Sequence, residues 1–292
     1  MLLKGKRDIH RGGLEKRCMK LRKYLLLPRL LLLAARAPRD QRLAPDRYWS
    51  EVARTGFDGD VLWDAGEPTE LTESAKRLYA HADPDLPIVD LGCGNGRQAR
   101  EFTRYAPRVL GLDRSAAAVN RARLEAVELP PPGPGSLQFR VADAAEPGMG
   151  KRLWDEMGEV NVHVRGMLHV VDPPDRPTVV SNLKAMLGDR GTAYVCETNL
   201  PGDALDYLVF QGATPTSMPV PLHRLVASGL RPPSHFGPTE LARYFPAADG
   251  WRLLVHGPLT LYGIPLRQGD GAQHIPGYFA VLQAPQLGAS EA

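Results

Sequence analysis

The chain has 292 residues, enough for one large α/β domain with an extension or for two small domains. Its three cysteines (Cys18, Cys93 and Cys196) lack metal-site spacing and do not suggest a disulfide framework, so a reducing, cytoplasmic compartment is predicted. The net charge of +3 hides an asymmetry, because residues 1–44 carry thirteen Lys or Arg against three acidic residues and the remainder carries twenty-three against thirty. No nucleic-acid partner is expected, since a body built to hold one should be basic.

The first 44 residues are interpreted as a basic extension outside the core, with the domain proper running over 45–292. Leucines at 25–27 and 30–33 flank Pro28-Arg29. This apolar stretch is too short to span a membrane and, with its arginine, is a poor signal-peptide core. No transmembrane segment is therefore expected. An organellar transit peptide, a surface amphipathic helix and a translation start placed too far upstream stay open as alternatives.

From residue 45 onward, helices and strands alternate. Helices are predicted over 47–54, 69–81, from 97 to about 105, 115–128 and 174–187. Strands are predicted over 86–91, 107–113, 136–142, 159–164, 191–197, 251–256 and 277–283. The first five strands imply a parallel sheet with right-handed crossovers, and a Pro/Gly-rich loop would join the last two.

The most informative segment is the run from Ile88 to Gly96, which reads IVDLGCGNG. It combines a short apolar strand, a carboxylate and a glycine turn that leads into a helix, an arrangement typical of nucleotide sites. Asp90 would repel a pyrophosphate, and Arg97 breaks the G-x-G-x-x-G pattern, so a nicotinamide oxidoreductase is disfavoured. A ligand with an adenosine end and a positively charged end, such as S-adenosylmethionine, suits a carboxylate better.

This segment resembles motif I (D/E-x-G-x-G-x-G) of the class I S-adenosylmethionine-dependent methyltransferases of the small-molecule type. Arg108 to Asp113 resembles motif II, whose acid accepts from both ribose hydroxyls. Asp143 matches the acid that accepts from the adenine amino group. The resemblance, over about residues 45–285, implies a Rossmann-like α/β fold. Its seven-stranded sheet would be mostly parallel, with an antiparallel last strand and helices on both faces.

The residues expected to bind the cofactor gather beyond the carboxyl ends of the strands. They are Asp90, Gly92, Cys93, Gly94, Gly96, Asp113, Arg114, Asp143, Ala144 and Arg165. No metal site is expected.

The run from Arg165 to Val170 resembles motif IV of small-molecule methyltransferases and contains the expected catalytic residue, His169. Imidazole is a suitable general base because it titrates near neutral pH. The alternative is that His169 orients a loop or touches the cofactor. Glu197 or Arg165 could orient an acceptor, whereas His163, inside a strand, is expected to be a core histidine.

A long stretch, 199–250, separates strands five and six and is interpreted as a lid over the substrate, with His223 and His235 as candidate pocket residues. The predicted function is methyl transfer from S-adenosylmethionine to a small molecule, at oxygen first and nitrogen second. Protein or RNA methylation, and a non-catalytic cofactor-binding partner subunit, are the alternatives. The sequence gives no basis for an oligomeric state.

Overall fold

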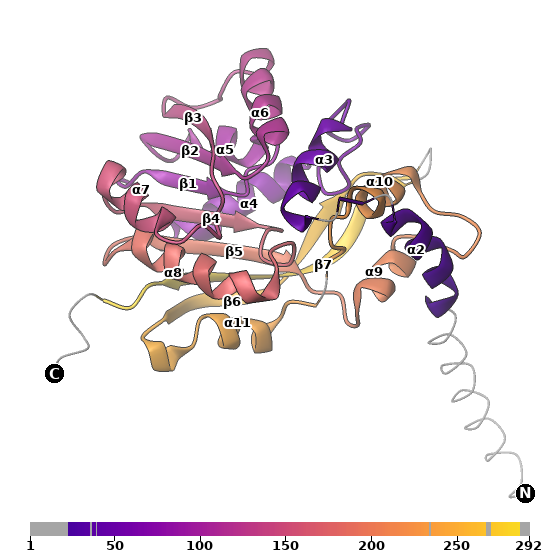
Figure 1. Ribbon diagram of the computed structural model, residues 1–292. Coiled ribbons are helices and arrows are strands. Elements are labelled where there is room, and N and C mark those ends of the chain that lie inside the picture. Colours follow the sequence, from indigo (N-terminus) through magenta and orange to yellow (C-terminus); the bar gives the residue numbers. More distant parts are fainter. Residues whose placement is uncertain (1–22, 36, 39, 234, 267–269, 287–292) are drawn as a thin grey trace, which may run out of the picture.

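The computed structural model describes residues 23–35, 37–38, 40–233, 235–266 and 270–286. Its centre is one seven-stranded sheet in the order β3-β2-β1-β4-β5-β7-β6 (Figure 1). Strands β1 to β5 run parallel, and β7 is antiparallel to both β5 and β6. This confirms the predicted Rossmann-like α/β fold.

The seven strands lie where the sequence predicted them, but the last two are longer. They are β1 (Ile88–Leu91), β2 (Arg108–Asp113), β3 (Ser136–Val141), β4 (Asn161–Arg165), β5 (Thr192–Thr198), β6 (Arg252–Gly263) and β7 (Gln273–Gln283). The predicted strands were shorter because Pro258 and Pro276 favour a loop between them. Pro258 fits a strand because β6 is at the sheet edge, and Pro276 lies just beyond the last β5–β7 pair, Thr198 with Gly277. The hairpin therefore extends past the sheet.

Helices cover both faces of the sheet because strand side chains alternate between two cores. Ile88 packs with α4 (Pro68–Tyr79), α5 (Arg97–Phe102) and α6 (Ala116–Glu128). Its neighbour Val89 packs with α7 (Met149–Met157), α8 (Arg176–Leu187) and α11 (Pro238–Tyr244). Helix α6 begins as predicted, with the Ser115 hydroxyl accepting from Ala118 N at 3.1 Å. Helix α7 was not predicted.

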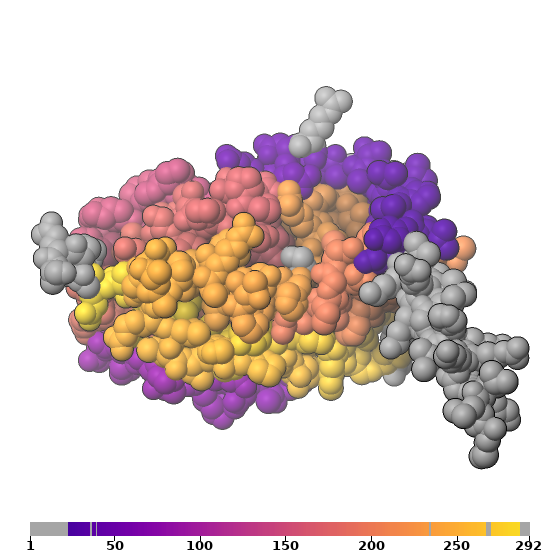
Figure 2. Space-filling view, turned by 90° about the horizontal axis from the view of Figure 1, so that it is seen from below, coloured from indigo at the N-terminus to yellow at the C-terminus, as the bar shows by residue number. Residues whose placement is uncertain are grey.

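A cap of short helices covers the carboxyl end of the parallel strands. It comprises η1 (Lys23–Leu26), α2 (Leu27–Ala34), η2 (Gln41–Leu43), α3 (Ala44–Ser50), α9 (Ala204–Phe210) and α10 (Val220–Ser228). Figure 2 shows the indigo N-terminal helices together with salmon and orange residues of the cap at one end of the molecule. Two further turns, η3 (Pro173–Asp175) and η4 (Ala247–Asp249), precede α8 and β6. No helix among the described residues is long and apolar enough to cross a membrane.

The expectation that residues 1–44 lie outside the core is wrong for 23–44. Leu26 and Leu33 are 1% and 6% exposed and belong to the core that includes the cap. The ammonium of Lys23 lies 2.8 Å from Asp203 and 2.7 Å from Asp206 at the start of α9. Apolar burial and these ion pairs join this segment to the rest of the domain. Residues 1–22 lie outside the residues that the structure describes, so the expectation is not tested for them.

Candidate active site

The turn after β1 brings backbone close to a pocket. Gly92, Gly94 and Gly96 have φ angles of 80°, 55° and 74°, a region that side chains with a Cβ rarely adopt. A Cβ on Gly94 would come within 2.9 Å of the Trp49 ring, and one on Gly96 within 2.5 Å of Phe139. Glycine is therefore required both by conformation and by space. Gly96 itself precedes α5 as its N-cap residue and does not line the pocket.

The carboxylate of Asp113, at the end of β2, holds this turn in place. Its Oδ2 accepts from Gly94 N at 3.0 Å and its Oδ1 from Ser115 N at 2.9 Å. Burial, with a smaller contribution from the charge of Asp90, raises the pKa of Asp113 to about 6. Asp113 also faces the pocket, so its remaining lone pairs are available to a ligand.

Asp90 is almost fully buried, 3% exposed, and hydrogen-bonds through only one oxygen within the described part of the chain. Its Oδ1 lies 2.8 Å from Nδ1 of His163, whereas Oδ2 has no partner there. A buried acceptor without a donor is costly, so this oxygen is suited to a ligand that brings a donor. His163 is fully buried between Phe102 and Tyr194, as expected of a core histidine.

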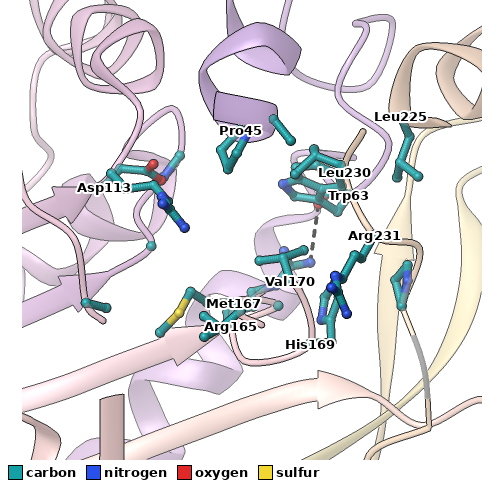
Figure 3. Close-up of a pocket in the computed structure, with 18 of the residues that line it drawn as sticks. Pro45, Trp63, Asp113, Arg165, Met167, His169, Val170, Leu225, Leu230 and Arg231 are labelled. Carbon is teal, nitrogen blue, oxygen red and sulfur yellow. Dashed lines mark hydrogen bonds between the residues drawn. The ribbon is translucent and has the colours of Figure 1, made fainter. Parts of the chain in front are cut away.

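Two adjoining pockets open at the carboxyl ends of β1, β2 and β4. Figure 3 shows the larger one. Among the predicted cofactor residues, the larger pocket is lined by Gly92, Gly94, Asp113, Arg114, Asp143, Ala144 and Arg165. The smaller one contains Asp90 and Cys93 and shares Gly92, Gly94 and Arg165 with the first. The structure thus brings all the predicted residues to these two pockets except Gly96.

The end of the large pocket beyond β2 and β3 is polar. Arg114 lies 3.3 Å from Oδ2 of Asp143, and Oδ1 of Asp143 accepts from Ala145 N at 3.0 Å. The side chains of Arg114 and Asp143 are 25% and 31% exposed, so both remain accessible to a ligand. Cys93 is buried behind the turn, and burial raises the pKa of its thiol well above the usual value, which leaves it a neutral packing group.

Arg165, the last residue of β4, lies between the two pockets. Its Nε pairs with Glu70 of α4, and its Nη2 donates to the Trp63 carbonyl at 3.3 Å. The other oxygen of Glu70 accepts from Tyr262 N at 2.9 Å, which connects α4 to the β6–β7 hairpin. The nearby carboxylate raises the pKa of the Arg165 guanidinium even though burial opposes this. A fixed cation therefore lies at the pocket wall.

His169 and Glu197, which the sequence analysis considered separately, form one pair. Nδ1 of His169 lies 2.6 Å from Oε2 of Glu197, and the carboxylate is fully buried at the end of β5. The other oxygen, Oε1, accepts from the backbone N–H groups of Met167 and Leu168 at 2.9 and 2.7 Å. Both the loop and the imidazole are fixed by this one carboxylate. His169 lines the pocket, and its side chain is 10% exposed.

Sequence reasoning missed the segment 51–67, which has no periodic pattern and closes one side of the site. Asp64 is 6% exposed and accepts from Gly56 N, from Asn95 Nδ2 and from both Nε and Nη2 of Arg97. Asn95 and Arg97 belong to the glycine turn and its helix. The segment therefore fastens the turn from outside. The only available sequence signal was the acid beside Trp63, which is weak.

The cap side of the larger pocket is apolar. It is lined by Trp49, Trp63, Val170, Tyr207, Leu225, Leu230, Leu261 and Ile275. Two charged residues that also line this pocket are paired with each other, since Arg231 lies 2.5 Å from Asp172. Most of these apolar residues come from α3, α9, α10 and the hairpin, and Trp63, Val170 and Leu230 come from connecting segments.

The predicted lid stretch 199–250 divides into two parts. Residues up to Pro233 contribute to the pocket, whereas α11 packs against the α8 side of the sheet. Tyr207 lines the pocket and is 3% exposed, but Phe210 is 44% exposed and does not line it. Neither His223 nor His235 lines either pocket; His235 lies 3.9 Å from Glu240.

Comparison with known proteins agrees with this geometry. Residues 88–191 match the family described as a methyltransferase domain. A search of curated proteins finds no matching sequence. A S-adenosylmethionine-dependent methyltransferase from Anabaena variabilis has a TM-score of 0.71 at 24% identity, over 85% of this chain and 96% of that one.

Two further solved structures share the fold at lower similarity. One, described in work on the conversion of a disulfide bond into a thioacetal group during echinomycin biosynthesis, has a TM-score of 0.57 at 19% identity, over 78% of this chain and 87% of that one. The other, from Methanosarcina mazei, has a TM-score of 0.52 at 18% identity, over 72% and 97%. The family match covers β1 to β4 and α8, and the strand order of the sheet is that of the Rossmann-like methyltransferase fold; together they support an S-adenosylmethionine-dependent methyltransferase enzyme.

Proposed function

We propose that this enzyme methylates an oxygen atom of a small, largely apolar acceptor, with His169 as the general base. The observation that carries the proposal is the His169–Glu197 pair at the pocket wall. A buried carboxylate at Nδ1 fixes the ring and favours a proton on that nitrogen, which leaves Nε2 as the acceptor. Nε2 would then take the proton from a hydroxyl as the acceptor oxygen attacks.

The residues around the glycine turn fit S-adenosylmethionine. Asp113, Asp143 and Ala144 all line the larger pocket, where Asp113 would accept from the two ribose hydroxyls and Asp143 from the adenine amino group. The unpartnered Oδ2 of Asp90 fits the ammonium end, and Arg165 can oppose the carboxylate of the same methionine part. When bound, the cofactor supplies a methyl group already activated by its sulfonium.

The chain then has to align the acceptor and exclude water. Held at about 3–3.5 Å from the methyl group, a nucleophile gains much of the rate from proximity alone. Trp49, Trp63, Leu225 and Leu230 provide an apolar wall, while the charged pair of Arg231 and Asp172 is already neutralised. An acceptor with a flat or branched apolar body suits this wall better than a charged one.

An oxygen acceptor is favoured over nitrogen because a hydroxyl keeps its proton at neutral pH and needs a base, whereas a neutral amine does not. Nitrogen remains the second candidate, since the same imidazole could remove a proton from an ammonium group. Protein or RNA methylation is less well supported. The pocket is apolar on its cap side, and residues 45–292 carry a net negative charge.

Methyl-labelled S-adenosylmethionine, incubated with the enzyme and a size-fractionated cell extract, tests the proposal. Label is expected in the low-molecular-mass fraction, and a methyl ether or a base-labile methyl ester among the labelled products would identify oxygen. Label in protein or RNA would refute the small-molecule assignment. Release of S-adenosylhomocysteine only when a second protein is added would indicate a cofactor-binding partner subunit instead.

A further inference from the structure

The segment Lys23–Ala34 turns a strongly apolar surface toward solvent. Helix α2 reads LPRLLLLA, so Arg29 is its only charged residue. Its inner side is buried through Leu26 and Leu33. The outer side chains, here called the leucine face, are 41–72% exposed and comprise Tyr24, Leu25, Leu27, Leu31 and Leu32.

A helix that is apolar on all sides normally has a cover on all sides. Five large apolar side chains within nine residues form a contiguous patch, unlike the scattered single residues that any surface carries. The segment is also firmly attached, because Lys23 pairs with Asp203 and Asp206 beneath it. The leucine face is therefore displayed by a fixed element of the cap.

The distribution of charge along the chain indicates which partner covers the leucine face. Residues 1–22, immediately before this segment, carry eight Lys or Arg against two acidic residues, whereas residues 45–292 carry an excess of seven acidic residues. An anionic lipid surface attracts the basic residues 1–22 and repels the acidic body, so it would orient the enzyme with the leucine face toward the lipid. Stable membrane attachment generally needs two signals, and an apolar patch that follows a polybasic stretch in the sequence supplies both. We propose that the leucine face docks this enzyme on an anionic membrane surface, to which the basic sequence of residues 1–22 adds electrostatic attraction.

The leucine face lies at the same end of the molecule as the larger pocket. Helix α10 lies against α2 on one side and contributes Leu225 to the pocket wall on the other (Figure 1). Gln41, Ala44 and Pro45, which follow α2 in sequence, line the same pocket. An enzyme docked in this orientation would hold its apolar pocket next to the lipid. The inference concerns attachment and stands independently of the acceptor proposed above.

Co-sedimentation of the full-length protein with vesicles tests it. The protein is expected to sediment with vesicles of phosphatidylcholine and phosphatidylglycerol at low salt, and not with phosphatidylcholine alone. High salt should release the protein from the vesicles, because salt screens its electrostatic attraction to the anionic lipid. Replacing Leu31→Ser and Leu32→Ser together is expected to weaken binding by about tenfold or more.

A matched control is available on α6, where Leu124 and Val127 are 59% and 80% exposed. The pair Leu124→Ser and Val127→Ser removes similar apolar surface at another site and is expected to leave vesicle binding unchanged. Melting curves of both double variants confirm folding, since all four side chains lie on the surface. Equal binding by the leucine-face variant and the control, or no sedimentation of the wild type, would overturn the proposal. So would a wild-type dimer that the leucine-face variant converts to monomer, because the face would then join two copies.

Discussion

The backbone N–H of Gly94 donates to Oδ2 of Asp113 across 3.0 Å, which connects the turn after β1 to the carboxylate that ends β2. Two motifs separated by a helix in the sequence thus form one unit in space. The same carboxylate is buried enough for its pKa to rise to about 6. The shape of the turn and the charge state of Asp113, the proposed ribose-binding group, are consequently linked.

Affinity for S-adenosylmethionine is expected to fall as the pH drops through about 6. In the proposed role, the ionised form of Asp113 would accept from the ribose hydroxyls. Below its pKa of about 6 the protonated form dominates and would have to lose its proton on binding. Above about pH 7 the affinity should be constant. Calorimetry from pH 5 to 8 measures this, with Asp113→Asn as the control.

The Asp113→Asn variant should bind about 1.5–3 kcal/mol more weakly at pH 7.5, the scale of a hydrogen bond to a charged group. It should also lose the decline between pH 7 and 5. A variant with wild-type affinity, or a wild type whose affinity does not change over this range, would be inconsistent with the assigned role of Asp113.

Asp64→Ala is expected to lower the free energy of unfolding by about 2–3 kcal/mol, because Arg97 and Asn95 would lose their buried partner. The matched control is Glu156→Ala, which removes the exposed pair with Arg140 and should cost less than about 1 kcal/mol. Urea unfolding of both variants measures the difference. Equal losses would show that the 51–67 segment does not fasten the glycine turn.

Tyr207→Ala is expected to raise the KM for the acceptor while leaving the affinity for S-adenosylmethionine within about twofold, because Tyr207 lies on the cap side of the pocket. Phe210→Ala, three residues away on the outside of α9, should have no effect. Steady-state kinetics with the identified acceptor compares them. If both variants match the wild type, α9 does not contribute to the acceptor site.

Removing residues 1–22 should preserve the melting temperature of the domain, whereas removing residues 1–44 should lower it. The second deletion removes the apolar burial of Leu26 and Leu33, which should cost at least ~2 kcal/mol of stability. It also eliminates the ion pairs of Lys23. Calorimetric melting of the two shortened chains gives the comparison. Indistinguishable melting temperatures would mean that residues 23–44 contribute nothing to stability.

The sequence predicted the parts of this molecule that depend on local chemistry. Asp90, the three glycines and Asp113 could be recognised because strand, turn and acid follow one another within 26 residues. The pairing of His169 with Glu197 could not, since it depends on β4 and β5 being neighbours in the sheet. The extent of β6 and β7 was underestimated because edge position, which makes Pro258 acceptable, is a property of the whole sheet.

The contribution of residues 51–67 and of α2 was missed for a related reason. Asp64 acts through partners in the glycine turn, and Leu26 and Leu33 are buried by a cap assembled from distant segments. A basic, leucine-rich N-terminus resembles a targeting sequence when it is considered alone. Only its contacts with α9 and α10 distinguish a packed segment from an appendage.

The most direct test of the account is to measure cofactor binding and methyl transfer in the same samples of wild type and His169→Gln. The account assigns His169 to the acceptor and not to the cofactor. It therefore predicts that the dissociation constant for S-adenosylmethionine changes by less than about twofold, while methyl transfer to the acceptor slows by about 100-fold or more. The Glu197→Gln variant keeps an oxygen beside Nδ1 of His169, so its rate of methyl transfer should lie between those of the wild type and His169→Gln. Methyl transfer by His169→Gln at the wild-type rate would contradict the account.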